Sequence, residues 1–138
     1  TGGVEILDYV VVEDGGVLIN PMVVEGQVYG GAAQGIGTAL YEAMRYDANG
    51  QPLASTLADY TLPGAGETPM IRIDHIETPS PNTRFGQKGI GEGGAIAPPA
   101  AIVNAINDAL APLGVEIGEI PATPHLILSA LAEREAAA

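Results

Sequence analysis

The stretch MVVEGQVYGGAAQGIGTALYEAM, residues 22–44, decides the fold of this chain. Its apolar side chains recur every four residues, which is the spacing of one face of an α-helix. These apolar positions are Val24, Val28, Ala32, Ile36, Leu40 and Met44. The stretch therefore predicts one long helix over residues 22–44, around which the rest of the chain must be arranged.

This helix is unusual because it contains Gly26, Gly30, Gly31, Gly35 and Gly37. A glycine inside a helix costs about 1 kcal/mol relative to alanine. Five of them together cost about as much as the whole net stability of a small domain. We therefore expect something to pack directly against the helix backbone. Either a second helix or a bound ligand would do so, and the sequence leaves both open.

Strand patterns lie on both sides of the helix. Residues 4–12 are rich in β-branched side chains and end in Glu-Asp-Gly-Gly, which predicts a hairpin turn and a return strand over 17–19. Residues 70–76 alternate as a strand, and 53–62 do so weakly. The sequence thus predicts a short mixed or antiparallel sheet.

Two further helices are expected in the last third of the chain. Pro98-Pro99 suits the first turn of a helix that stops at Gly114, and Thr123-Pro124 suits the start of another. Together these elements predict a single α+β domain over residues 1–138, with the helices packed on one face of the sheet.

The composition excludes several classes of function. The net charge of −12 disfavours nucleic acid and anionic membrane surfaces as partners. The absence of cysteine excludes thiolate and iron–sulfur ligands, and the two histidines lack metal-ligand spacing, so we expect no metal ligand in this chain. Neither a membrane span nor a signal peptide is evident, which favours the cytoplasm. Only 16% of the residues are charged, and the chain starts without methionine, so we expect a piece of a larger assembly.

The glycine loop FGQKGIGEGG, residues 85–94, holds Glu92 and the only lysine, Lys88. Glycines give another molecule access to both the carboxylate and the bare backbone. A solvated surface loop would have the same composition. The loop also matches G-x-G-x-x-G, yet no strand precedes it and Glu92 would face a pyrophosphate. A Rossmann-type dinucleotide site is therefore the less favoured alternative.

Four blocks of this sequence together resemble a known family. They are residues 26–37, Asp59-Tyr60 with Leu62-Pro63, residues 77–82, and Lys88-Gly-Ile-Gly-Glu92. In order and spacing they resemble the C-terminal part of the molybdenum hydroxylases. These are the molybdopterin-binding large subunits of the xanthine dehydrogenase, aldehyde oxidoreductase (aldehyde oxidase) and carbon monoxide dehydrogenase family. The resemblance implies that this chain is the C-terminal segment of a molybdopterin-binding domain.

The resemblance implies a role for each matched residue. Glu92 falls on the family's catalytic general base, and Gln27 on a glutamine that forms hydrogen bonds near the metal's oxygen ligands. Lys88, Gly89, Ile90 and Gly91 fall on contacts to molybdopterin cytosine dinucleotide, whose phosphates suit a lysine. A base needs open space around it, which the neighbouring glycines provide.

The resemblance also implies an assembly. The expected partners are the remainder of the large subunit, an FAD-binding subunit and a [2Fe-2S] subunit. The expected reaction is oxidative hydroxylation of a small molecule, namely an aldehyde, an N-heterocycle or a CO-like substrate. We expect the isolated chain to retain no cofactor and to be inactive. The rival hypothesis is a non-catalytic structural or assembly domain, in which Glu92 would be ion-paired and Gln27 would lie elsewhere.

Overall fold

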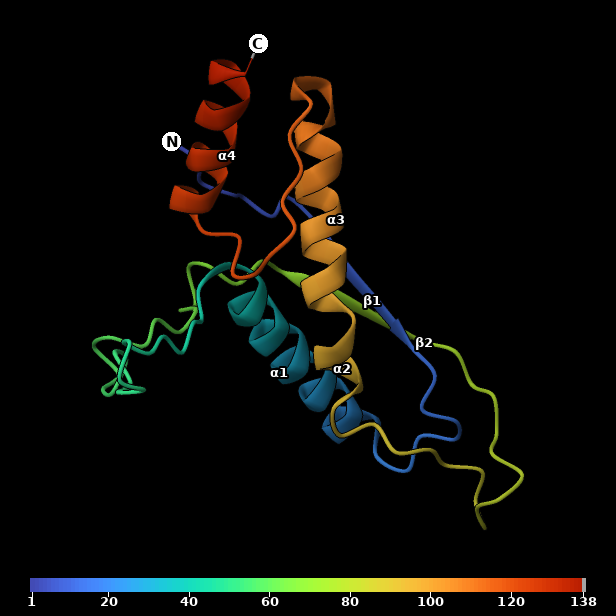
Figure 1. Ribbon diagram of the computed structural model, residues 1–138. Coiled ribbons are helices and arrows are strands. Elements are labelled where there is room, and N and C mark those ends of the chain that lie inside the picture. The colour runs from blue at the N-terminus through green and yellow to red at the C-terminus, as the bar shows by residue number, and fades with distance from the viewer. Residues whose placement is uncertain (138) are drawn as a thin grey trace.

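Helices cover one side of a small sheet in the computed structural model, which describes residues 1–137 (Figure 1). The elements follow one another in the order β1 (Tyr9–Glu13), α1 (Pro21–Leu40), β2 (Ile71–His75), α2 (Gly93–Ile96), α3 (Pro98–Leu110), a 3-10 turn (Ala111–Leu113) and α4 (Pro124–Ala136). The α+β class and the packing of the helices on one face agree with the sequence analysis.

The two strands form a parallel pair, in which Tyr9 lies opposite Ile71 and Glu13 opposite His75. Side chains alternate along both strands, so that every second one faces the helices and the others face solvent. Parallel strands need a long crossover, and here it contains α1. The crossover brings the ends of β1 and β2 to the same edge.

The predicted hairpin is wrong. Residues 17–19 form no strand, and β1 pairs with β2 instead. The cause is local: Asp14 Oδ1 accepts the Gly16 amide at 2.9 Å, and Gly16 has φ +61°. This turn directs residues 15–17 toward residues 86–88, and Gly16 forms an antiparallel bridge with Gln87. The weak strand predicted over 53–62 is also absent, and those residues form loops and turns.

Helix α1 begins earlier than expected and ends earlier too. Asn20 caps it, because its Oδ1 accepts the Val23 amide at 3.3 Å, and Pro21 occupies the first helical position. The helix ends at Leu40 rather than at residue 44. Its buried face contains the apolar residues that the four-residue spacing predicts, Val24, Val28, Ala32, Ile36 and Leu40.

Four of the five glycines of α1 form two pairs with different surroundings. A Cβ on Gly31 would lie 2.9 Å from the Ala95 amide nitrogen, and one on Gly35 would lie 2.6 Å from Pro98 Cβ. This pair therefore lets α2 and the start of α3 pack against the helix backbone. By contrast, Gly26 and Gly30 have nothing within 4 Å of a Cβ position. The expected partner helix is found for one pair, while the other pair faces open space.

The core lies between α1, β2, α3 and α4. Ile36 and Ile71 are fully buried, and Ile102, Ile106 and Ile127 belong to the same cluster of buried residues. The C-terminal helices follow the sequence signals, since Gly114 adopts φ +64° after the 3-10 turn and Thr123 caps α4. Among residues 1–137, no helix has the length and apolarity that crossing a membrane requires.

Candidate active site

The glycine loop is fixed in place by its backbone. The Lys88 amide donates to Gly15 O at 2.9 Å, and the Val17 amide donates to Gly86 O at 3.1 Å. The two segments approach so closely that a Cβ on Gly16 would overlap Gly86 O. Gly86 itself has φ +77°, a conformation that favours glycine. The main chain leading to Lys88 is therefore held by the turn that follows β1.

Lys88 is held at its other end by a carboxylate. Its Nζ lies 2.8 Å from Asp14 Oδ2, and the two side chains are 34% and 31% exposed. The Lys88 ammonium, together with the amides of Gly16 and Thr78, holds the pKa of Asp14 far below its ordinary value. Asp14 was not among the site residues predicted from the sequence. It could have been suspected as the partner of Lys88, because it is an acid beside glycines and Lys88 is the only lysine of the chain.

Gln27 reaches the loop from α1. Its Nε2 donates to Gly91 O at 2.8 Å, across a sequence separation of 64 residues. Gly91 directly precedes Glu92, so the fold brings Gln27 against the main chain of the residue next to Glu92. The bond uses one of the two amide N–H groups of Gln27 and leaves its side-chain oxygen free for other contacts.

Glu92 is exposed, at the N-terminal end of α2. Within residues 1–137, its carboxylate forms no ion pair and no hydrogen bond, and it does not cap α2. Its backbone oxygen accepts the Ala95 amide at 2.9 Å, so the main chain at this residue is fixed. The side chain is accessible to a ligand, while its attachment point belongs to an ordered turn.

The loop between Lys88 and Glu92 leaves its backbone uncovered. Neither Gly89 nor Gly91 has any atom within 4 Å of a Cβ position, and both are exposed. Ile90 between them is partly buried. Within the described part of the chain, the amides of residues 89–91 donate no hydrogen bond. The loop therefore offers free donors to an approaching group.

A polar pair lies behind this loop. Glu13 and His75 are opposite each other at the ends of β1 and β2. Glu13 Oε2 and His75 Nδ1 are both buried and have no hydrogen-bond partner in the residues described. The Glu13 carboxylate occupies the space that a Cβ on Gly93 would need. Because Gly93 has no Cβ, the Glu13 carboxylate at the end of β1 can lie directly against the main chain next to Glu92.

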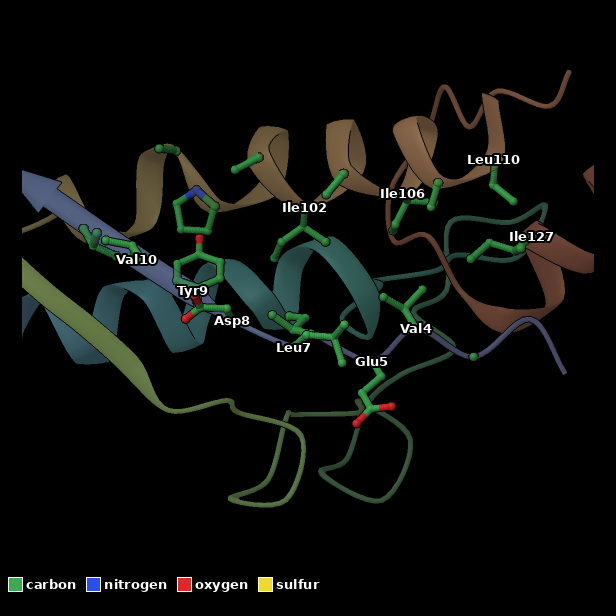
Figure 2. Close-up of a pocket in the computed structure, with 18 of the residues that line it drawn as sticks. Val4, Glu5, Leu7, Asp8, Tyr9, Val10, Ile102, Ile106, Leu110 and Ile127 are labelled. Atoms are coloured by element: carbon green, nitrogen blue, oxygen red, sulfur yellow. The ribbon is translucent and has the colours of Figure 1, made fainter. Parts of the chain in front are cut away.

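A separate apolar cavity of about 1050 Å³ lies between the N-terminal segment and α3. Figure 2 shows Val4, Leu7 and Tyr9 along one side of it, and Ile102 and Ile106 along the other. The cavity approaches the glycine loop only at Gly93 and Gly94, and its lining includes none of the predicted site residues. No group of three or more His, Asp or Glu side chains in residues 1–137 is arranged to hold a metal ion.

Comparisons with known proteins identify the family. A family model described as the molybdopterin cofactor-binding domain matches residues 1–69. The nicotine 6-hydroxylase large subunit of Paenarthrobacter nicotinovorans is 48% identical over 130 residues, which cover 94% of this chain and 16% of that protein.

Solved structures agree with the sequence relatives. The crystal structure of quinoline 2-oxidoreductase from Pseudomonas putida 86 matches with a TM-score of 0.89 and 51% identity, over 92% of this chain and 16% of that one. Reconstituted CO dehydrogenase from Oligotropha carboxidovorans matches with a TM-score of 0.93 and 33% identity, over 100% of this chain and 17% of that one.

This chain spans about one sixth of the length of the proteins that it matches. The resemblance found in the four sequence blocks, the fold with α1 at its centre and the match over residues 1–69 all agree. The chain belongs to the molybdopterin cofactor-binding domain family.

Proposed function

We propose that this chain is the C-terminal segment of the large subunit of a molybdenum hydroxylase, in which it supplies Glu92 as general base. The observation that carries the proposal is the 2.8 Å hydrogen bond from Gln27 Nε2 to Gly91 O, beside an exposed Glu92. It joins α1 to the loop at the residue where the base is expected. The resemblance alone does not supply that contact.

The residues of the loop suit the molybdopterin cytosine dinucleotide cofactor. Gly89 and Gly91 leave space that a Cβ would fill, so a ligand can approach the backbone amides of residues 89–91. The Lys88 ammonium has three donors, and its ion pair with Asp14 occupies one of them. The remaining donors suit a phosphate. Gln27 keeps its second amide N–H, which can donate to an oxygen of the cofactor, and its side-chain oxygen.

In this proposal the cofactor, when bound, supplies the oxygen nucleophile and accepts the electrons of the oxidation. Glu92 contributes the proton acceptor, because its carboxylate is unpaired in the described residues and open to a reactant. A general base must come within about 3 Å of the proton that it removes, which a sealed, ion-paired carboxylate cannot do. Gln27 holds the main chain at Gly91 and thereby sets the position of Glu92.

The proposal extends to the assembly. The rest of the large subunit covers the apolar cavity along β1 and α3, and FAD-binding and [2Fe-2S] subunits carry the electrons away in the cytoplasm. The substrate is a small molecule. Two of the similar proteins are named for nicotine and quinoline and are 48% and 51% identical, whereas the CO dehydrogenase is 33% identical. These values favour an N-heterocycle over an aldehyde or a CO-like substrate.

The rival proposal, a domain that keeps the fold without the chemistry, requires no open carboxylate at this place. It would leave Glu92 sealed by an ion pair and Gln27 on a distant surface. The exposed Glu92 and the bond from Gln27 to Gly91 both support the catalytic proposal instead. The two proposals make opposite predictions for a single substitution.

That substitution is Glu92→Gln in the full-length enzyme. It keeps the size of the side chain but removes its ability to accept a proton, so we expect turnover to fall by about 10²-fold or more. Steady-state rates with an N-heterocycle, measured beside molybdenum and cytosine-nucleotide content, provide the test. The matched control is Glu135→Gln, an exposed carboxylate near the end of α4. Normal turnover by a fully loaded Glu92→Gln enzyme would end the general-base proposal.

A further inference from the structure

Asp14 joins three segments that are far apart in the sequence. Its Oδ1 accepts the Gly16 amide at 2.9 Å and the Thr78 amide at 3.1 Å. Its Oδ2 accepts from Lys88 Nζ at 2.8 Å. One carboxylate therefore contacts the turn after β1, the segment after β2 and the glycine loop.

We propose that Asp14 is a positioning residue for the cofactor that the glycine loop binds, and that it acts through the Lys88 ammonium. This inference rests on the proposed function, since it concerns the same loop. The role of Asp14 is not to bind the cofactor itself, because a carboxylate repels phosphate. Its role is to hold the ammonium in one place before the cofactor arrives.

The reason is the flexibility of lysine. A lysine side chain loses much conformational entropy when it is fixed, and a binding site that fixes it in advance avoids that loss on binding. The ion pair with Asp14 fixes the ammonium with one donor and leaves the others available. The chain has a single lysine and a net charge of −12, so no second lysine of its own can replace this one.

The position of the loop main chain does not depend on this ion pair. The bonds from the Lys88 amide to Gly15 O and from the Val17 amide to Gly86 O are made between backbone atoms. The turn after β1 depends on Asp14 Oδ1 and not on Oδ2. The effect on the ammonium can therefore be separated from the effect on the fold.

The substitution Asp14→Asn separates the effect on the Lys88 ammonium from the effect on the fold. Asparagine keeps a side-chain oxygen that accepts the Gly16 and Thr78 amides, and it replaces the charged oxygen beside Lys88 with an N–H donor. In the purified full-length enzyme complex, we expect cytosine nucleotide to be released about threefold to tenfold faster, in line with the loss of a partly exposed charged hydrogen bond. Amide hydrogen exchange at Val17, Thr78 and Lys88 should stay unchanged, since Val17 and Lys88 donate to backbone oxygens and asparagine keeps the side-chain oxygen that accepts the Thr78 amide.

A double-mutant cycle tests whether Asp14 acts through Lys88. Lys88→Gln alone should speed nucleotide release, and adding Asp14→Asn to it should change nothing further, because the pair is already broken. The matched control is Asp8→Asn, which breaks the exposed ion pair with Arg72 and should leave release unchanged. If Asp14 only supported the fold, the effects of Asp14→Asn and Lys88→Gln on the rate of nucleotide release would instead be additive.

Several results would overturn the inference. They are an unchanged release rate in Asp14→Asn, additive effects in the cycle, or faster amide exchange at Val17 and Thr78. All three leave the proposed function intact, since none concerns Glu92. A purified complex that holds no cytosine nucleotide at all would overturn the proposed function, and this inference with it.

Discussion

At the scale of single residues, the site depends on one side chain that reaches across the fold. Gln27 lies on α1 and contacts the loop before Glu92 through the carbonyl of Gly91. A hydrogen bond to a backbone carbonyl fixes main-chain position, while the glycine at the contact imposes no side-chain constraint of its own. Gln27 thus acts on the loop, and Glu92 remains free to meet a reactant.

Replacing Gln27 with alanine should lower turnover about tenfold in the intact enzyme. The loss of one hydrogen bond costs up to about 1.5 kcal/mol, and the upper end of that range corresponds to about tenfold. Molybdenum content should remain near normal, because the contacts proposed between the cofactor and residues 88–91 do not involve the Gln27 side chain. Steady-state rates beside metal analysis provide the measurement.

Gln34 provides the control for this experiment, because it is an exposed glutamine on the same helix. Its backbone oxygen accepts from Thr38, while its side chain forms no hydrogen bond within residues 1–137. Gln34→Ala should therefore leave turnover unchanged. Equal losses of turnover in Gln27→Ala and Gln34→Ala would show that the effect comes from changing α1 in general and not from losing the bond to Gly91.

At the scale of elements, only some of the glycines of α1 lie against other parts of this chain. Gly31 and Gly35 meet the backbone of α2 and the ring of Pro98, whereas Gly26 and Gly30 meet nothing in this chain. The second pair lies on the turns that flank Gln27. A close approach by cofactor or by another part of the subunit would explain why glycine is present there.

This division predicts opposite effects for two alanine substitutions. In the isolated chain, Gly31→Ala should destabilise the fold by about 1–3 kcal/mol, since its Cβ would press on the backbone of Gly94 and Ala95. Gly30→Ala should stabilise it by about 0.5–1 kcal/mol, because alanine favours the helix. Urea unfolding measures both values. A Gly31→Ala chain that is as stable as the Gly30→Ala chain would contradict the packing argument.

The sequence predicts α1, α3 and α4 well because their signals are local. Apolar residues every four positions, Pro98-Pro99 and Thr123 each act within a turn or two of themselves. The parallel pairing of β1 with β2 was not predicted, since it joins residues on either side of a long crossover. The turn at Asp14 looked like a hairpin because its glycines fit one, while the Asp14 side chain closes a different turn.

The candidate site was predicted only in part from its residues. The glycine loop and the open Glu92 could be found from composition alone. The role of Gln27 came from the resemblance to the molybdenum hydroxylases, because no local pattern links it to Gly91. The ion pair between Asp14 and Lys88 was missed, since two residues so far apart in sequence give no spacing signal.

At the scale of the whole molecule, the chain leaves much apolar surface uncovered. The cavity of about 1050 Å³ along α3 has mostly apolar walls, and Leu7 is 87% exposed at its edge (Figure 2). Only 16% of all residues are charged. These features are typical of a surface that other parts of a protein cover. They agree with the proposal that the remainder of the large subunit packs here.

Hydrogen exchange should report this difference between the isolated chain and the full enzyme. In the isolated chain, the amides of residues 89–91 should exchange fast, because they have no partner in the described residues, while the Lys88 amide is protected by Gly15 O. In the loaded enzyme, residues 89–91 should gain protection from the cofactor. Equal exchange at residues 89–91 in the two samples would contradict a backbone cradle for the cofactor.

The parallel pairing of the strands also bears on the order of events during synthesis. A growing chain that has reached residue 70 contains β1 and α1 but not yet β2, so Tyr9–Glu13 has no β2 to pair with. Contacts between distant residues form late, because the intervening loop must first close. The glycine loop, residues 85–94, comes after β2 in the chain and forms hydrogen bonds with the turn after β1. The glycine loop can therefore reach its position against this turn only after β1, α1 and β2 have all left the ribosome, so a release of the chain before residue 94 would leave the turn after β1 without its partner.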